Sequence, residues 1–228
     1  MQPAFQYDRH TLIALRSSVS PERLQRYECI AAGDAAQALR LYVWNTELSE
    51  SLYGPIQGLE VTLRNKIQER FTHQFGARWY DDPRIGLQYV QRDQVLRAKQ
   101  ALQHQGKPLD SPRLIAELSF GFWVGLFGRK YETHLWRPHL RQLFVNSPRF
   151  FLRKDVHRVL DEIRLLRNRL AHHEPILQRP LAKEHGLVLT AIGWLCAPTT
   201  SWVAHHSRFD SVYSARPWRP PLVVTARG

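Results

Sequence analysis

The sequence predicts an all-α protein with at least six helices, folded as one domain with a docked C-terminal segment. Apolar side chains recur at helical spacing in several stretches, and a period of about 3.6 residues is typical of helices with one buried face. Helix start and stop signals flank these stretches, whereas the alternation that marks β-strands does not recur and no internal repeat is visible. With 228 residues, 43% of them apolar, the chain is long enough for one well-formed core.

The expected domain begins at a clear helix start signal. Ser20 and Pro21 have the character of an N-cap followed by proline at the first helical position. Residues 1–19 are therefore interpreted as an N-terminal extension, and residues 20–210 as the helical domain. The end of the chain, residues 211–228, is rich in proline and arginine and is expected to form a loose tail.

A glycine–proline pair is expected to divide the next forty residues into two helices. The first follows Gly33, and Gly54-Pro55 is expected to end it because proline disrupts a helix interior. The second begins at Pro55 and is closed by Gly76. Its helical spacing predicts one buried face, formed by Ile56, Leu59, Leu63, Ile67 and Phe71.

Four further segments complete the expected helical pattern. Residues 91–105 read as a short basic helix, and residues 112–128 are apolar on nearly every side, which predicts a central buried helix. Another helical stretch follows over 131–144, with Pro138 expected as a break. The last apolar segment, residues 187–206, should dock on the domain.

Composition points toward a polyanionic partner in a reducing compartment. Lys and Arg outnumber Asp and Glu by 32 to 20, which gives a net charge of +12. This balance favours nucleic acid first and an acidic membrane surface second, although a merely soluble basic protein has the same composition. Two distant cysteines, Cys29 and Cys196, form neither a disulfide framework nor a thiol zinc motif. Without a signal peptide or an uninterrupted apolar span, the protein is expected to be cytoplasmic and not membrane-bound.

Residues 164–175, RLLRNRLAHHEP, bring cations and two histidines to the end of one predicted helix. Arg167 falls near the edge of the apolar stripe, so we expect it to be half-buried beside a carboxylate or phosphate. Asn168 and His172 are four residues apart and lie within roughly 40° of each other on the polar side. The apolar stripe of this helix, expected to face the core, consists of Val156, Val159, Leu160, Ile163, Leu166 and Leu170.

Two interpretations of this helix end remain open. A helix C-terminus favours nearby cations by about 0.3–1 kcal/mol each, so Arg167, Arg169, His172 and His173 can be ordinary dipole partners. Alternatively, they suit RNA cleavage without metal, since histidine with a reference pKa of about 6.5 transfers protons at neutral pH and arginine stabilises phosphorane charge. A metal site is not expected, because His172, His173 and Glu174 are consecutive and point in different directions. Two copies meeting across a dimer axis would supply more of these groups.

The stretch Arg167-Asn168-Arg169-Leu170-Ala171-His172 matches the R-N-x-x-x-H signature of HEPN domains. The longer stretch LLRNRLAHHEPI closely resembles the corresponding part of Abi-like (abortive infection, AbiD/AbiF-type) bacterial proteins. Further blocks resemble the same family in the same order, from SPERLQRYECIAAGD through IAELSFGFWVGLFG and YETHLW to WLCAPTTSWVAHHSRF. The resemblance covers about residues 20–210.

This resemblance implies a HEPN-like helical bundle that forms a homodimer through the motif-bearing helix. It also implies a metal-independent endoribonuclease, without a cofactor, acting in phage defence or a toxin–antitoxin system. Carried over residue by residue, Arg167 and His172 are the catalytic pair and Asn168 is the polar residue that accompanies them. Some HEPN proteins only bind RNA or another protein, so the alternative is a non-catalytic binding module. Its partner would be RNA, a small regulatory RNA or an antitoxin.

Additional contacts are expected around this motif. Arg169 and His173, also about 40° apart on the helix, are candidate phosphate contacts. Arg64 and Asn65 either belong to an internal pair between Arg64 and Glu60, four residues earlier, or pack near the Arg167 helix and shape an RNA-binding cleft. Three tryptophans either stack on bases or simply belong to the core, namely Trp44, Trp79 and Trp123.

Overall fold

The computed structural model describes residues 5–148 and 151–217, and every regular element within these ranges is helical. The predicted all-α class is therefore confirmed. In chain order the α-helices are α1 (Arg9–Val19), α2 (Pro21–Ile30), α3 (Ala35–Phe75), α4 (Tyr89–His104), α5 (Ser111–Glu117), α6 (Phe120–Gly125), α7 (Arg153–Ala171), α8 (Leu181–Leu195), α9 (Ala197–His206) and α10 (Phe209–Ser214). Shorter 3₁₀ turns are η1 (Trp79–Asp81), η2 (Pro83–Ile85), η3 (Arg129–Tyr131) and η5 (Arg141–Leu143), and η4 (Glu132–Leu140) is π-helical.

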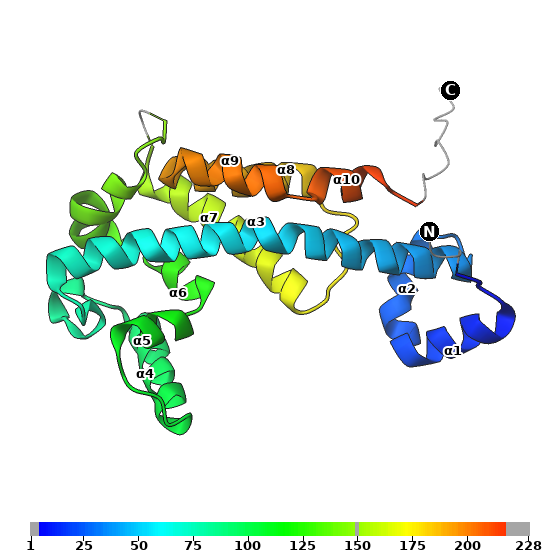
Figure 1. The fold of residues 1–228 in the computed structure, drawn as a ribbon, viewed down its shortest axis with the longest axis horizontal. Helices are drawn as coiled ribbons and strands as arrows, with labels where there is room; N and C mark the ends of the chain where they lie inside the picture. Colours follow the sequence, from blue (N-terminus) through cyan, green and yellow to red (C-terminus); the bar gives the residue numbers. More distant parts are fainter. Residues whose placement is uncertain (1–4, 149–150, 218–228) are drawn as a thin grey trace.

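The long helix α3 runs through the centre of an elongated molecule. Helices α8, α9 and α10 lie along one side of it, α1 and α2 lie at its N-terminal end, and α4 to α6 lie toward its C-terminal end (Figure 1). Helix α7 contacts α3, α6 and α8, so the motif-bearing helix is fixed from three directions. None of the helices in the described ranges has the length and apolar character needed to cross a membrane.

The expected break at Gly54-Pro55 is wrong, because α3 continues through both residues for 41 residues. Proline inside a helix normally costs about 3 kcal/mol, since it removes a hydrogen bond and crowds the preceding turn. Packing on both sides of the proline offsets this cost. Leu52 and Ile56 are 0% and 3% exposed, and burying one such side chain contributes about 1.5–3 kcal/mol.

Two other predicted boundaries are also corrected. The apolar segment 112–128 is buried as expected, but it forms two helices, because Ser119 caps a new one by accepting a hydrogen bond from the Phe122 backbone N–H. Pro138 lies inside η4 and does not end it. The wider turn of a π-helix accommodates the proline ring, and prolines and π-turns are both common at irregular points of helices.

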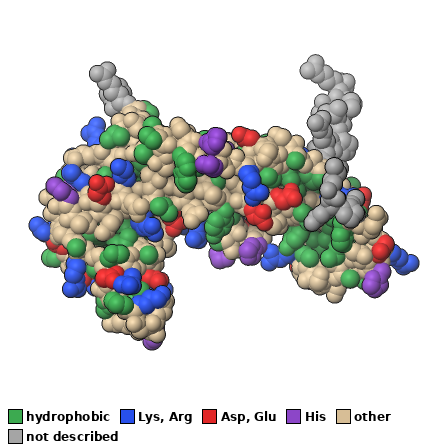
Figure 2. All heavy atoms as spheres, viewed as in Figure 1, with side chains coloured by type: hydrophobic (Ala, Val, Ile, Leu, Met, Phe, Trp, Pro, Cys, Tyr) green, Lys and Arg blue, Asp and Glu red, His purple; other side chains and the backbone are tan. Residues whose placement is uncertain are grey.

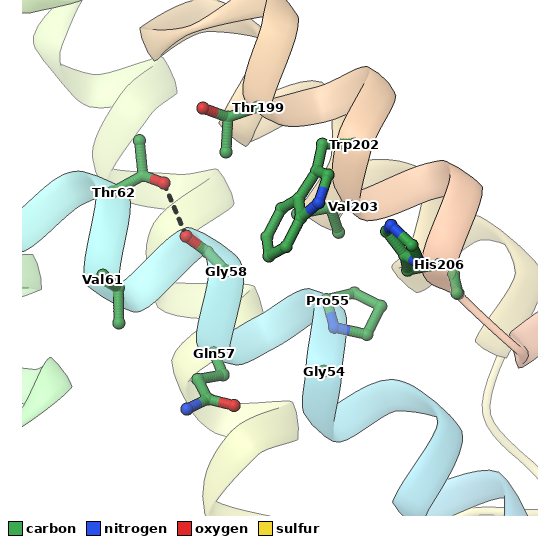
Figure 3. Close-up of a pocket in the computed structure, with 11 residues that line it drawn as sticks. Gly54, Pro55, Gln57, Gly58, Val61, Thr62, Thr199, Trp202, Val203 and His206 are labelled. Atoms are coloured by element: carbon green, nitrogen blue, oxygen red, sulfur yellow. Dashed lines mark hydrogen bonds between the residues drawn. The ribbon is translucent and has the colours of Figure 1, made fainter.

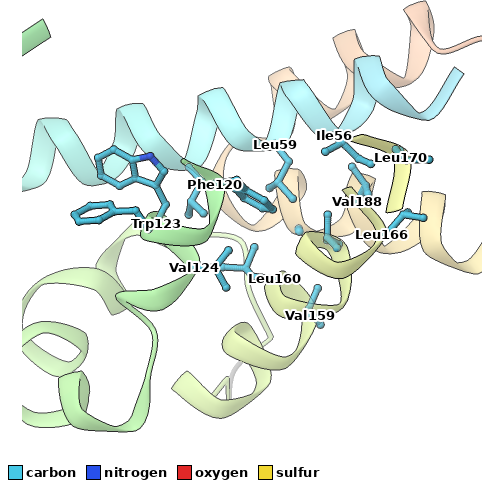
Figure 4. Close-up of a cluster of buried hydrophobic side chains, with 14 of the residues drawn as sticks. Ile56, Leu59, Phe120, Trp123, Val124, Val159, Leu160, Leu166, Leu170 and Val188 are labelled. Carbon is cyan, nitrogen blue, oxygen red and sulfur yellow. The ribbon is translucent and has the colours of Figure 1, made fainter. Parts of the chain in front are cut away.

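The core forms where α3, α6, α7 and α8 meet (Figure 4). All six apolar residues of the predicted α7 stripe are at most 4% exposed, which confirms the face assigned from helical spacing. The five residues predicted for the second half of α3 are at most 3% exposed. The three candidate stacking tryptophans belong to the core, with exposed fractions of 5%, 0% and 0% for Trp44, Trp79 and Trp123.

The C-terminal segment docks on α3, as predicted. Helices α8, α9 and α10 all contact α3, and the indole N–H of Trp44 donates to the carbonyl oxygen of Val212 at 2.9 Å. Helix α10 spans the boundary expected at residue 210. Residues 218–228 of the predicted tail lie outside the described ranges. At the other end, α1 packs on α2, with an ion pair of 2.8 Å between Arg16 and Glu28.

Two helical glycines differ in what surrounds them, which gives a matched test of the packing. At Gly186 of α8 an added Cβ would meet nothing within 4 Å, whereas at Gly58 of α3 it would lie 2.9 Å from Cγ2 of Val203 on α9 (Figure 3). Gly186→Ala should raise the free energy of unfolding by about 0.5–1 kcal/mol, because alanine is the better helix former. Gly58→Ala should lower it by about 1–3 kcal/mol through overpacking. Urea unfolding of both variants checks this, and equal stabilities of the two variants would contradict the close packing of α9 on Gly58.

Burial of His185 predicts a pH dependence of the docked segment. The imidazole is 6% exposed, stacks on Phe209 and lies 3.1 Å from the Ser207 hydroxyl. Burial lowers the pKa of His185 from its ordinary value of 6.5, and the nearby Asp210 only partly opposes this shift. Between pH 6.5 and the lower pKa of the folded state, His185 therefore binds more protons in the unfolded chain than in the folded one. The stability that comes from the buried neutral imidazole is complete above pH 6.5 and is lost as the pH falls through the folded-state pKa.

Replacing this imidazole should reduce the acid sensitivity. His185→Gln removes the titrating group and keeps a polar atom for Ser207, so the variant should lose less unfolding free energy than the wild type between pH 7 and about pH 5. Urea unfolding of the two proteins at both pH values measures the difference. Equal losses in the two proteins would show that His185 does not contribute.

Candidate functional site

Helix α7 ends before the histidines, earlier than the position of Pro175 suggests. The last helical residue is Ala171, and His172 is the C-cap. His173 has a φ of +54°, its N–H donates to the carbonyl of Leu170 at 3.1 Å, and the Glu174 N–H donates to the carbonyl of Arg169 at 2.9 Å. This pair of bonds is a Schellman motif, and histidine tolerates the left-handed region better than most residues. Because His173 ends the helix, the imidazole of His172 lies just beyond the last turn.

Arg167 is half-buried beside a carboxylate, as its position at the edge of the stripe predicts. Its side chain is 35% exposed, and Nε lies 3.9 Å from Oε2 of Glu60 on α3. At this distance the contact is a charge pairing without a hydrogen bond. Arg167 and Glu60 line a cavity of about 260 Å³ between α3 and α7.

Arg64 and Asn65 separate into two different environments. Glu60 pairs with Arg167 and not with Arg64, whose Nε donates to Oδ1 of Asn65 at 3.3 Å. The partner of Glu60 is therefore Arg167 on α7, and not Arg64 on its own helix α3. Arg64 lines the cavity that contains Arg167, as expected for a residue that shapes a cleft, whereas Asn65 is exposed and does not line it.

The two histidines belong to a second cavity, of about 450 Å³, between α2 and the end of α7. Both His172 and His173 are exposed, and neither side chain makes a hydrogen bond or ion pair within the described ranges. Helix α2 contributes Arg23 and Arg26 to the same cavity. Nη1 of Arg23 donates to the carbonyl oxygen of His173 at 3.2 Å, so α2 and the end of α7 are directly connected.

The arginines of α2 were not predicted from the sequence. They lie about 150 residues before the histidines, and no local pattern in SPERLQRYECI distinguishes them from ordinary surface cations. Arg26 donates to the side-chain oxygen of Gln178, and this hydrogen bond connects α2 to the chain that follows α7. Glu22 also lines this cavity, and a hydrogen bond from its own backbone N–H, followed by one from Ser20, lowers the pKa of its carboxyl.

Backbone strain borders this second cavity. Ser20 has a φ of +84° and His173 a φ of +54°, and the described chain holds one further non-glycine residue with positive φ, Ala32. Conformations of this kind cost about 1–3 kcal/mol each and concentrate where a structure needs a particular shape. Ser20 adopts its conformation while it ends α1 and caps α2 by accepting from the Arg23 N–H. The turn between α1 and α2, which positions Arg23, therefore depends on the strained backbone of Ser20.

A single chain keeps the motif residues apart. Arg167 faces the cavity beside α3, and His172 faces the cavity beside α2. Asn168 is half-buried, and its side-chain amide has no hydrogen-bond partner in the described ranges. Arg169, predicted as a phosphate contact, forms an ion pair of 2.9 Å with Glu174. Among the described residues no group of three or more histidine, cysteine, aspartate or glutamate side chains is arranged to hold a metal ion.

The fold and the site define an elongated all-α protein in which one helix end presents free imidazoles beside arginines. Figure 2 shows Lys and Arg side chains spread over the visible face without forming one continuous basic patch. On this face the distribution of basic side chains does not mark one site, so the candidate site rests on the arrangement of residues around α7. Comparison of the chain with family models, curated proteins and solved structures gives no match in any of the three.

The end of α7 provides a test that separates backbone geometry from side-chain chemistry. His173→Gly should raise the free energy of unfolding by about 1 kcal/mol, because glycine adopts the left-handed conformation without the penalty of a Cβ. His173→Ala removes the imidazole and keeps that penalty, so it should give no comparable gain. Urea unfolding of both variants decides the matter, and equal stabilities would contradict the helix-ending role of His173.

Proposed function

We propose that the protein is a metal-independent endoribonuclease of the HEPN type, related to the Abi-like proteins and acting in the cytoplasm in phage defence or a toxin–antitoxin system. One observation carries the proposal. The R-N-x-x-x-H motif ends in an exposed, unpartnered imidazole, His172, and begins with Arg167, whose nearest carboxylate oxygen is 3.9 Å away. Both side chains are thus accessible to a substrate phosphate, which supports a role beyond pairing with the helix dipole.

The chemistry requires two proton transfers and a stabilised phosphorane. One imidazole accepts the proton of the RNA 2′-hydroxyl as its oxygen attacks the adjacent phosphorus. A second, protonated imidazole donates a proton to the leaving 5′-oxygen, and the products are a 2′,3′-cyclic phosphate and a 5′-hydroxyl. Each proton transfer contributes about 10²–10⁴-fold to the rate. The guanidinium of Arg167 would stabilise the negative charge that develops on the phosphorane.

This chemistry favours a homodimer as the active form. Arg167 and His172 of one chain line different cavities, so one copy does not bring both to the same phosphodiester. Two α7 ends placed together would supply two copies of His172 and two of Arg167 to one cleft. One copy of His172 would then accept the proton of the 2′-hydroxyl, and the other copy would donate a proton to the leaving oxygen.

A second candidate function is a non-catalytic module that binds RNA, a small regulatory RNA or an antitoxin. The observation that favours it is the same separation of Arg167 and His172 within one chain. In this case the basic side chains contact phosphates or an acidic protein surface, and no bond is broken. Binding to RNA would weaken steeply with salt, whereas replacing His172 would leave binding unchanged.

Cleavage in the presence of EDTA distinguishes the two functions. The wild-type protein should cut single-stranded RNA with EDTA present and leave cyclic phosphate ends. His172→Ala and Arg167→Ala should each reduce the cleavage rate at least about 100-fold, because each removes a group that acts on the reacting atoms. Gel analysis of end-labelled RNA measures the rate, and circular dichroism verifies that each variant keeps its helical fold.

Matched control variants remove the effect of net charge. His104 is exposed at the last turn of α4, and Arg158 lies on α7 in an exposed pair with Glu162. His104→Ala and Arg158→Ala should cut RNA at the wild-type rate. Cleavage that needs a divalent ion, or that survives in His172→Ala, would exclude the proposed mechanism. RNA binding without cleavage in every variant would support the second function.

A further inference from the structure

The cavity between α3 and α7 contains more than the motif arginine. On its α3 side lie Tyr53, Gln57, Glu60 and Arg64, at intervals of four, three and four residues. Residues at these intervals share one face of a helix, so the four side chains form a continuous row opposite Arg167. Three apolar residues, Ile56, Val61 and Leu170, complete the lining. Of these, Ile56 and Leu170 are almost fully buried.

We propose that this cavity is a nucleotide-binding subsite for single-stranded RNA. In this subsite Arg64 and Arg167 hold one phosphate, Tyr53 stacks on the adjoining base, and Gln57 contacts the edge of that base. The inference rests on the proposed function for its ligand, RNA, but it assigns Tyr53 and Gln57 a recognition role that the motif does not include.

The charges in the cavity favour an anion. Two guanidinium groups, of Arg64 and Arg167, and one carboxylate, of Glu60, line the cavity, which leaves a net positive charge. Arg64 uses one N–H on the neighbouring Asn65, and the contact from Arg167 to Glu60 is longer than a hydrogen bond. Since each guanidinium carries five N–H donors in a planar fork, most donors of the pair remain available for phosphate oxygens.

Tyr53 has the properties of a stacking platform. The residue is 50% exposed, and within the described ranges the ring makes no aromatic contact and the hydroxyl makes no hydrogen bond. The core tryptophans, in contrast, are buried and inaccessible to a ligand. Proteins bind unpaired bases by stacking them on such exposed rings, and neighbouring amide groups read the base edges. Gln57 is exposed one helical turn further along α3, within reach of a base on Tyr53.

Glu60 has a defined place in this subsite. Its carboxylate lies 3.9 Å from Nε of Arg167 in the free protein, so its negative charge would repel a phosphate that binds to Arg167. Removing the negative charge of Glu60 should therefore strengthen RNA binding, which is the opposite of the effect expected for a residue that contacts RNA directly. Glu50, exposed on the same helix and outside the cavity, provides the matched control.

Binding to an uncleavable RNA tests the subsite independently of catalysis. The full-length protein is titrated with a fluorescent single-stranded oligonucleotide whose 2′-hydroxyls are methylated, because the capped oxygen cannot attack the phosphorus. Tyr53→Ala should weaken binding about tenfold or more, the range expected for the loss of one stacked base. Tyr53→Phe should bind like the wild type, since the ring is kept. Glu60→Gln should bind several-fold more tightly than Glu50→Gln.

The outcomes separate this inference from the proposed nuclease function. If the wild type binds and cuts RNA but Tyr53→Ala binds as tightly as the wild type, the subsite is wrong and the nuclease function stands. If RNA is bound through Tyr53 but is never cut, the subsite stands and the nuclease function is wrong. Equal binding by Glu60→Gln and Glu50→Gln would overturn the assigned role of Glu60, and no binding of RNA by the wild type would overturn both proposals.

Discussion

The packing of other helices along the continuous helix α3 is the constraint on which the other features depend. Its 41 residues carry buried side chains from Ala38 to Phe71, so α2, α6, α7, α8, α9 and α10 all dock on one rod. A break at Pro55 would release the two halves from each other. The first half carries α2 and its arginines, and the second half carries Glu60 and Arg64. Continuity of α3 therefore fixes both walls against which the end of α7 is placed.

Helix geometry explains why α7 divides its functional groups between two cavities. Residues five apart on an α-helix point about 140° away from each other. Arg167 consequently faces α3, while His172, just past the last turn, faces α2. The neighbours then determine what each group can do. Arg167 obtains a distant carboxylate and a second arginine, and His172 obtains an open cavity without a side-chain partner.

The sequence is informative where a property depends on one helix alone. The apolar stripe of α7, the half-burial of Arg167 and the cap at Ser20 follow from spacing and residue type, and all three are confirmed. The sequence misleads where packing opposes a local preference, as at Pro55 within α3. It is silent on Arg23 and Arg26, because only the fold brings α2 to the end of α7. The sequence also does not predict the pairing of Glu60 with Arg167, because only the fold brings α3 and α7 together.

The way ion pairs are distributed also explains why a net charge of +12 does not by itself define a binding surface. Exposed ion pairs contribute only about 0–1 kcal/mol, so a phosphate can replace a carboxylate at many arginines at little cost. What distinguishes these arginines is geometry. Arg169 already has a carboxylate at 2.9 Å, whereas Arg167 has one at 3.9 Å and faces Arg64 across a cavity. A phosphate would gain two guanidinium groups in that cavity, whereas at Arg169 it would gain one that is already paired, which favours the α3 side of α7 over its exposed side.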